Sequence, residues 1–179
     1  MKLITTLSIV LIFIVLSASR CKKDPVNPID QLPPETTTGA MTFGCKVNGK
    51  VFVPRDGRGR PGLFVQYVNL GNVPDGGWHL NIPAVDWIPS SIPLVSITTD
   101  SLLLTEGTTY AFKNLKGYPQ AFYSNDIAVY PKLDNDQGEL YITKFDQTNH
   151  ILSGRFSFVG TSSNGEKVNI TEGRFDIRY

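Results

Sequence analysis

Short apolar segments alternate with turn residues along the chain from Ala40 to Tyr179. Each segment is rich in Val, Ile, Phe, Tyr and Thr, and clusters of Gly, Pro, Asn and Asp separate one from the next, a pattern typical of consecutive β-strands. The best candidate for a helical turn lies near Asp100–Leu104. We expect a single all-β domain over residues 40–179, an antiparallel β-sandwich, with a partly open β-barrel as the alternative. Besides those at the two ends, strands are expected near residues 63–70, 78–82, 94–99, 109–112 and 121–130.

A tight hairpin is predicted at the start of this domain, where Asn48-Gly49 separates two apolar segments. Asn-Gly supplies the two positive φ angles of a type I′ turn, and a two-residue turn places Cys45 opposite Phe52. Together with Phe43, these side chains then share one face, which we assign to the core. Cys45 is therefore interpreted as a small buried apolar residue and not as a reactive thiol.

The sequence of the C-terminal part predicts three further strands, at residues 138–146, 151–159 and 168–179. Gly138–Asp146 and Ile151–Val159 flank a short turn, and the second segment alternates apolar and polar positions. A bulge is expected at Gly173, because the inward-facing set slips by one residue before Phe175. The predicted inward face of the second segment is Leu152, Gly154, Phe156 and Phe158, and the predicted solvent face is Ser153, Arg155 and Ser157.

The N-terminal 20 residues have the pattern of a secretory signal, a positive start followed by an apolar run too short for a confident membrane span. Leu16–Cys21 resembles the lipobox of bacterial lipoproteins, in which the Cys that follows the cleavage site is acylated. Cys21 is thus the predicted lipid-attachment residue, although Arg20 stands where that pattern prefers a small residue. The alternative is cleavage after Ser19, which releases a soluble protein with Cys21 free to pair with Cys45.

Residues 21–39 are predicted to be a Pro- and Thr-rich tether. The segment from Lys22 to Gly39 contains four prolines and many polar residues, and it has no period of 2 or 3.6. Fully extended, it would reach about 60 Å. A lipid at Cys21 would then hold the domain away from the membrane.

Composition argues against a nucleic-acid partner. Once Lys2 and Arg20 are removed with the signal, 15 basic residues face 16 acidic ones, and binding to nucleic acid needs a marked basic excess. The sequence also shows no catalytic constellation, so we expect a protein that is not an enzyme. His79 is predicted on the outer face of a strand and His150 at a turn, and neither is expected to be catalytic.

No cofactor and no metal ion is expected, because no His or Cys pair has the spacing of a ligand set. The segment Asp134–Glu139 resembles the opening of a calcium loop. Phe145 occupies the twelfth position, where such a loop needs a bidentate Glu. A polar turn is the preferred interpretation.

Two features remain as candidates for ligand binding. The loop from Arg55 to Gly62 carries Arg55, Arg58 and Arg60, and as a mobile basic loop it would bind carboxylate, sulfate or phosphate groups of an envelope polymer. The functional interpretation is the alternative here, and the preferred one is a hairpin loop that is merely solvated. Trp87, in a Pro-rich segment, is either packed over one end of the domain or exposed as a platform for a ligand such as a sugar.

Several segments resemble a family of small Bacteroidetes lipoproteins built on an uncharacterised domain: residues 38–50 (TGAMTFGCKVNGK), 142–146 (ITKFD), 152–158 (LSGRFSF) and 173–176 (GRFD). The resemblance implies a lipid-anchored protein of the cell envelope, at the outer membrane, facing the periplasm or the surface. It implies no activity. The preferred function is a tethered binding or adhesion module for a glycan or another ligand, and the alternative is a structural protein that contacts an envelope partner protein.

Overall fold

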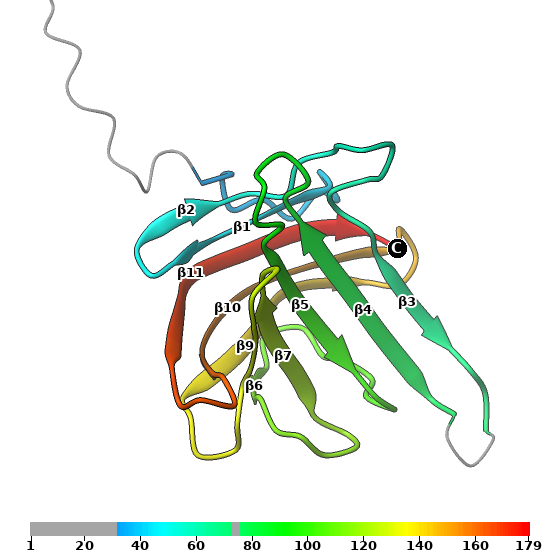
Figure 1. The fold of residues 1–179 in the computed structure, drawn as a ribbon. Helices are drawn as coiled ribbons and strands as arrows, with labels where there is room; N and C mark the ends of the chain where they lie inside the picture. Colours follow the sequence, from blue (N-terminus) through cyan, green and yellow to red (C-terminus); the bar gives the residue numbers. More distant parts are fainter. Residues whose placement is uncertain (1–31, 73–75) are drawn as a thin grey trace, which may run out of the picture.

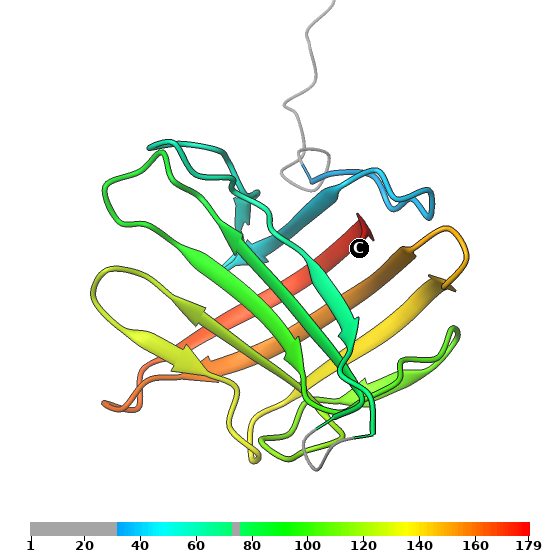
Figure 2. The same ribbon diagram turned by 90° about the vertical axis from the view of Figure 1, so that its right-hand side faces the viewer.

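The computed structural model describes residues 32–72 and 76–179, and in this part of the chain eleven antiparallel strands form two sheets. Six strands are ordered β2-β1-β11-β10-β9-β6 and five are ordered β3-β4-β5-β7-β8. The sheets pack face to face as a sandwich (Figures 1 and 2), the architecture preferred from the sequence. The strands are β1 (Thr42–Val47), β2 (Lys50–Phe52), β3 (Gln66–Asn69), β4 (Trp78–Val85), β5 (Leu94–Thr99), β6 (Thr109–Ala111), β7 (Pro119–Ser124), β8 (Val129–Pro131), β9 (Gly138–Asp146), β10 (Ile151–Thr161) and β11 (Lys167–Arg178).

The predicted N-terminal hairpin is confirmed. Asn48 and Gly49 have φ of 48° and 79°, and β1 pairs with β2 in the expected register, with Cys45 opposite Phe52. Phe43, Cys45 and Phe52 are buried in the core between the sheets. Burial raises the pKa of the Cys45 thiol, which agrees with its interpretation as an apolar core residue.

Two predicted elements were wrong. The helical turn near Asp100–Leu104 is absent, and Ser101 instead has a φ of +54°. The single strand expected near residues 121–130 is a hairpin, β7 and β8, because the side-chain oxygen of Asn125 accepts hydrogen bonds from the N–H groups of Ile127 and Ala128. Asn commonly reverses the chain in this way.

The bulge predicted in β11 is present, but Glu172 is the residue that adopts the left-handed conformation, with a φ of +53°. Gly173 has another role. Phe156 of β10 lies opposite Gly173, and a Cβ atom on Gly173 would be 2.5 Å from the Phe156 ring. The close approach of that ring therefore requires glycine. The bulge shifts the inward set of β11 from Ile170 to Phe175, as expected.

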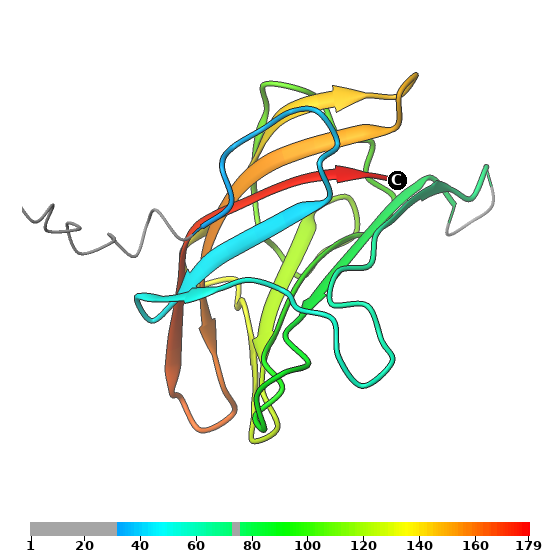
Figure 3. The same cartoon turned by 90° about the horizontal axis from the view of Figure 1, so that it is seen from above.

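The interpretation of residues 22–39 as an unpacked tether is wrong for residues 32–39. Leu32 is 6% exposed, and Pro33 lies so close to Gly44 that a Cβ there would be 2.6 Å from it. The segment crosses the outer face of the six-stranded sheet (Figure 3) and covers Ser153, which is therefore buried although its strand position predicted exposure. The folded domain begins at least eight residues before Ala40.

Hydrogen bonds to the Asp176 carboxylate hold this segment on the sheet. Among the described residues, the carboxylate accepts six, from the hydroxyls of Ser153, Thr36 and Thr38 and from the N–H groups of Thr38, Gly39 and Ala40. Burial alone would raise the pKa of Asp176, but these hydrogen bonds outweigh it and lower the pKa to about 2.

The predicted signal and Cys21 lie outside the described residues. Within the described ranges, no helix has the length and apolar character needed to cross a membrane.

Candidate functional site

The structure brings the four ligand-binding residues predicted from the sequence into one cluster. Arg55, Arg58 and Arg60 lie in the loop between β2 and β3, and Trp87 follows the end of β4. An isolated β-bridge joins Arg55 to Asp86 and sets the loop beside the chain that leaves β4. The cluster is at the upper end of the sandwich in Figures 1 and 2, the end at which residues 32–40 also lie.

The basic loop forms a small hairpin. Gly57 and Arg60 exchange two backbone hydrogen bonds, and Arg58 and Gly59 have φ of 54° and 72°, the geometry of a type I′ turn. The N–H of Gly62 donates to the Asp56 carboxylate at 2.7 Å and closes the loop at its base. The two arginines at the tip therefore project from a small hairpin.

Arg55 differs from the other two arginines because it is paired with a carboxylate of the protein, Asp86. Its Nε and Nη2 atoms donate to the two carboxylate oxygens of Asp86 at 3.0 and 2.6 Å, a bidentate pair. Asp86 is 7% exposed, and its hydrogen bond raises the pKa of the Arg55 guanidinium. No local pattern predicts this pairing, because 31 residues separate the partners. Arg55 thus fastens the loop, and its charge is already paired with Asp86.

Trp87 packs against the arginine loop at this end of the sandwich. Its indole N–H donates to the Pro61 carbonyl at 2.9 Å, and the Arg60 guanidinium carbon lies 5.1 Å from the centre of its ring. Gly57 permits this contact, since a Cβ there would lie 2.8 Å from the Trp87 Cβ. We call Arg58, Arg60 and the partly exposed Trp87 the Arg–Trp platform.

Neither arginine of the Arg–Trp platform forms an ion pair with a described residue. Arg58 makes one long contact, 3.5 Å from Nη2 to the Pro89 carbonyl, and Arg60 contacts only the indole ring. Both side chains are exposed. The platform thus presents two positive charges beside an aromatic ring, an arrangement suited to acidic groups on a ligand.

The residues that the sequence analysis considered for catalysis or metal binding contact other side chains of the protein. Nδ1 of His79 lies 3.4 Å from Asp100, and His150 packs against the ring of Tyr179. In the segment that resembles a calcium loop, Asp136 bonds to Lys167 and Thr161, and these bonds lower its pKa. No group of three or more His, Cys, Asp or Glu side chains that could hold a metal occurs in the described ranges.

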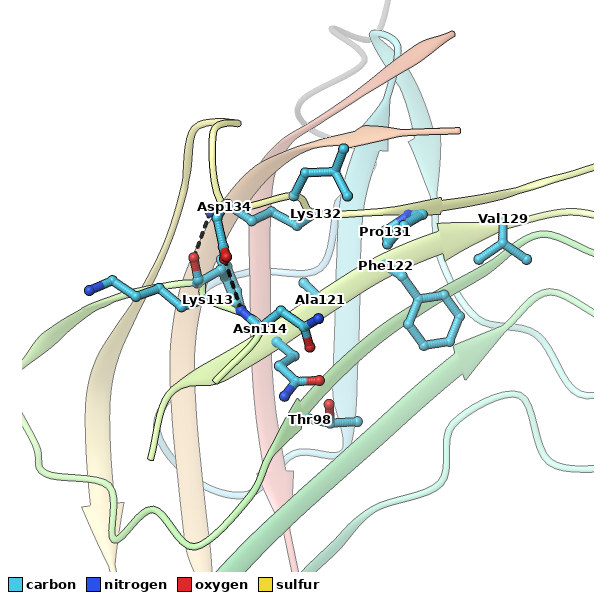
Figure 4. A pocket seen from close by; sticks show the side chains of 12 residues that line it. Thr98, Lys113, Asn114, Ala121, Phe122, Val129, Pro131, Lys132 and Asp134 are labelled. Carbon is cyan, nitrogen blue, oxygen red and sulfur yellow. Dashed lines mark hydrogen bonds between the residues drawn. The ribbon is translucent and has the colours of Figure 1, made fainter. Parts of the chain in front are cut away.

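A second concave feature lies at the opposite end of the five-stranded sheet, and sequence reasoning missed it. Leu94, opposite Val85, begins β5 at the platform end, so Thr98 and its partner Gln120 lie at the far end. Here a hollow of about 400 Å³ opens beside β7 and β8 (Figure 4). We call it the β7 hollow. Its walls include Thr98, Asn114, Gln120, Phe122, Pro131 and Asp134.

Comparison with family models finds that residues 92–176 are similar to a domain of unknown function, DUF6252. The match extends from the residues before β5 into β11 and includes ITKFD, SGRFSF and GRFD, whereas residues 38–50 lie outside it. It covers the β7 hollow and not the Arg–Trp platform. Comparisons with curated proteins and with solved structures gave no match.

Proposed function

We propose that this chain is a lipid-anchored cell-envelope protein of the Bacteroidetes lipoprotein type, whose domain is a non-enzymatic binding module. In this proposal Cys21 carries the lipid, and the Arg–Trp platform binds acidic groups of an envelope polymer. The observation that carries it is the pair of exposed arginines, Arg58 and Arg60, which have no carboxylate partner among the described residues and are set on a braced hairpin. Preorganised guanidinium groups bind carboxylate, sulfate and phosphate with little loss of side-chain entropy.

Binding to polyanions tests the platform. The full chain would be titrated at low ionic strength with polygalacturonate, dextran sulfate and polyphosphate, with uncharged dextran as the reference. We expect the variant Arg58→Gln/Arg60→Gln to lose about tenfold or more in affinity for at least one polyanion, and Trp87→Ala to lose less. Comparison of the three polymers identifies the preferred acidic group.

The matched control is Arg155→Gln/Arg178→Gln, which removes the same charge from exposed positions in β10 and β11. If this control weakens binding as much as the platform variant does, the polyanion is attracted by the net charge of the protein and not by the Arg–Trp platform. The platform proposal is then rejected. No binding of any polyanion by the wild-type chain leads to the same conclusion.

The anchor is tested separately, by intact-mass spectrometry of protein extracted from its native membrane beside a Cys21→Ala variant. The proposal expects a mass that begins at Cys21 with acyl chains added. An unlipidated mass that begins at Arg20 would support the soluble alternative. The proposed pairing with Cys45 would then need that side chain, fully buried in the core, to leave its site.

A second candidate function is contact with an envelope partner protein through the outer face of the six-stranded sheet. A hollow of about 540 Å³ lies on this face, and its walls carry charges of both signs from Glu35, Glu172, Arg155 and Arg174. Arg155 also stacks on Tyr141, 5.3 Å from the ring centre. Crosslinking would favour this function if a reproducible partner is captured by the wild-type chain and lost with Arg155→Gln/Arg178→Gln, while Arg58→Gln/Arg60→Gln keeps it.

A further inference from the structure

We propose that the β7 hollow is a binding site for one neutral sugar unit, whose ring packs on Phe122 and whose hydroxyl groups bond to Thr98, Asn114 and Gln120. This site is separate from the Arg–Trp platform and at the other end of the same sheet. Its volume of about 400 Å³ falls within the range of small-molecule sites in proteins.

The polar side chains of the hollow are available to a ligand. Among the described contacts, the Thr98 hydroxyl and the side-chain amides of Asn114 and Gln120 make no hydrogen bond within the protein. In Figure 4 the Thr98 hydroxyl and the Asn114 amide are directed toward the same hollow. An amide offers both donors and an acceptor, and a hydroxyl offers one of each kind, which suits the mixed donors and acceptors of sugar hydroxyls.

An apolar surface lies beside these groups. Phe122 projects from the outer face of β7 directly opposite Pro131 of β8, and both line the hollow (Figure 4). The ring of Phe122 is partly exposed. A sugar ring has an apolar C–H face, and an aromatic side chain presents an electron-rich face to such groups. Aromatic and amide side chains on adjacent walls therefore match the two kinds of surface on a pyranose.

The charges around the hollow are occupied by the protein itself. The Lys113 ammonium lies 4.3 Å from the centre of the Tyr118 ring, and the buried Lys132 ammonium donates to the Phe112 carbonyl. The Asp134 carboxylate accepts a hydrogen bond from the N–H of Asn114 at 3.0 Å. The polar lining side chains that make neither a hydrogen bond nor a ring contact among the described residues are the neutral ones of Thr98, Asn114 and Gln120, and these suit an uncharged ligand.

The same bonds make the hollow rigid. Lys132 and Asp134, which follow β8, bond to Phe112 and Asn114, which follow β6. The N–H of Lys113 donates to the carbonyl of Pro119, at the start of β7, at 3.0 Å. Three chain segments are thus fixed around the hollow before any ligand arrives. A preorganised site loses less conformational entropy on binding.

Saturation-transfer NMR on the full chain in detergent tests this site, with the methyl glycosides of glucose, galactose, mannose and N-acetylglucosamine as probes. We expect transfer to the ring protons of at least one glycoside and a millimolar dissociation constant. Phe122→Ala and Gln120→Leu should each weaken binding about tenfold. The matched controls are Phe64→Ala and Gln66→Leu, exposed residues of the same types near or in β3, which should leave binding unchanged.

Three results would overturn the proposal: no transfer to any glycoside, transfer that survives both Phe122→Ala and Gln120→Leu, or transfer to the apolar probe toluene alone. Thermal unfolding of each variant confirms that it folds, and Gln120→Leu provides the test if Phe122→Ala does not. Arg58→Gln/Arg60→Gln should bind the glycoside as the wild type does. Failure of the sugar site and failure of the platform are therefore distinguishable.

Discussion

Two buried carboxylates, Asp176 and Asp86, fasten peripheral segments to different sheets and use different partners. Asp176 is 1% exposed and is held by neutral hydroxyl and N–H donors, which bring residues 36–40 onto the six-stranded sheet. Asp86 is 7% exposed and is held by the guanidinium of Arg55, whose side chain is 52% exposed. A buried charge satisfied by neutral donors depends on pH and little on salt, whereas a half-exposed ion pair is screened by salt.

The two carboxylates, Asp176 and Asp86, therefore have different roles. Removal of Asp176 would leave several donors without an acceptor, one of them the fully buried Ser153 hydroxyl, so this carboxylate contributes to the stability of the whole domain. Removal of Asp86 would break the bidentate pair with Arg55 but would leave the backbone hydrogen bonds that join Arg55 to Val85 and Trp87, so a smaller effect on stability is expected.

The largest effect is expected for Asp176→Ala. The lost carboxylate leaves the Ser153 hydroxyl and the N–H groups of residues 38–40 unsatisfied, and we expect the free energy of unfolding to fall by about 4 kcal/mol. Urea unfolding followed by tryptophan fluorescence measures it. The control Asp126→Ala removes an exposed carboxylate and should cost less than about 0.5 kcal/mol. Equal losses in the two variants would show that the clamp contributes nothing.

Acid should weaken the same clamp. Because the folded-state pKa of Asp176 is about 2, below its ordinary value of 3.8, its contribution is present above pH 4 and is lost as the pH falls toward 2. The expected loss is about 2 kcal/mol. Asp136 and Asp146 also have lowered pKa values, so the measurement is the difference between the wild type and Asp176→Asn. Parallel pH profiles for the two proteins would contradict the prediction.

A smaller effect is expected for Asp86→Asn. The change removes the charge that pairs with Arg55, and we expect the midpoint of thermal unfolding to fall by about 3 °C at low salt and by less at 1 M salt. A stability loss as large as that of Asp176→Asn, or one that salt does not change, would remove the distinction between the two fastenings.

The features predicted correctly from the sequence depend on neighbouring residues. Asn48-Gly49 defines its own turn, and the alternation within β10 reports which face is buried, so hairpin, core and sandwich class followed without tertiary information. Asp176 and Asp86 could not be found in this way. Their partners are up to 140 residues distant, and nothing in a local pattern pairs them.

The candidate site was predicted only in part, because some of its contacts also join residues that are far apart in the sequence. The charge of the loop and the position of Trp87 in a Pro-rich segment marked the platform, but only the structure shows that Asp86 occupies Arg55 and that Arg58 and Arg60 remain exposed. The β7 hollow gave no sequence signal. Its polar walls come from β5, β7 and two loops, each of which has the composition of ordinary surface.

The smallest effect concerns a single donor of the Asp176 clamp. Thr36 donates to the carboxylate at 2.6 Å, and Thr36→Val keeps the shape of the side chain while it removes that hydrogen bond. We expect a loss of about 1 kcal/mol in the free energy of unfolding and an upward shift in the pKa of Asp176, read from its carboxyl resonance by NMR. The control is Thr37→Val, next in the chain but exposed and without a hydrogen bond of its side chain to a described residue. A pKa that stays near 2 in Thr36→Val would mean that the other donors, the Ser153 and Thr38 hydroxyls and the backbone N–H groups of residues 38–40, hold the carboxylate without Thr36.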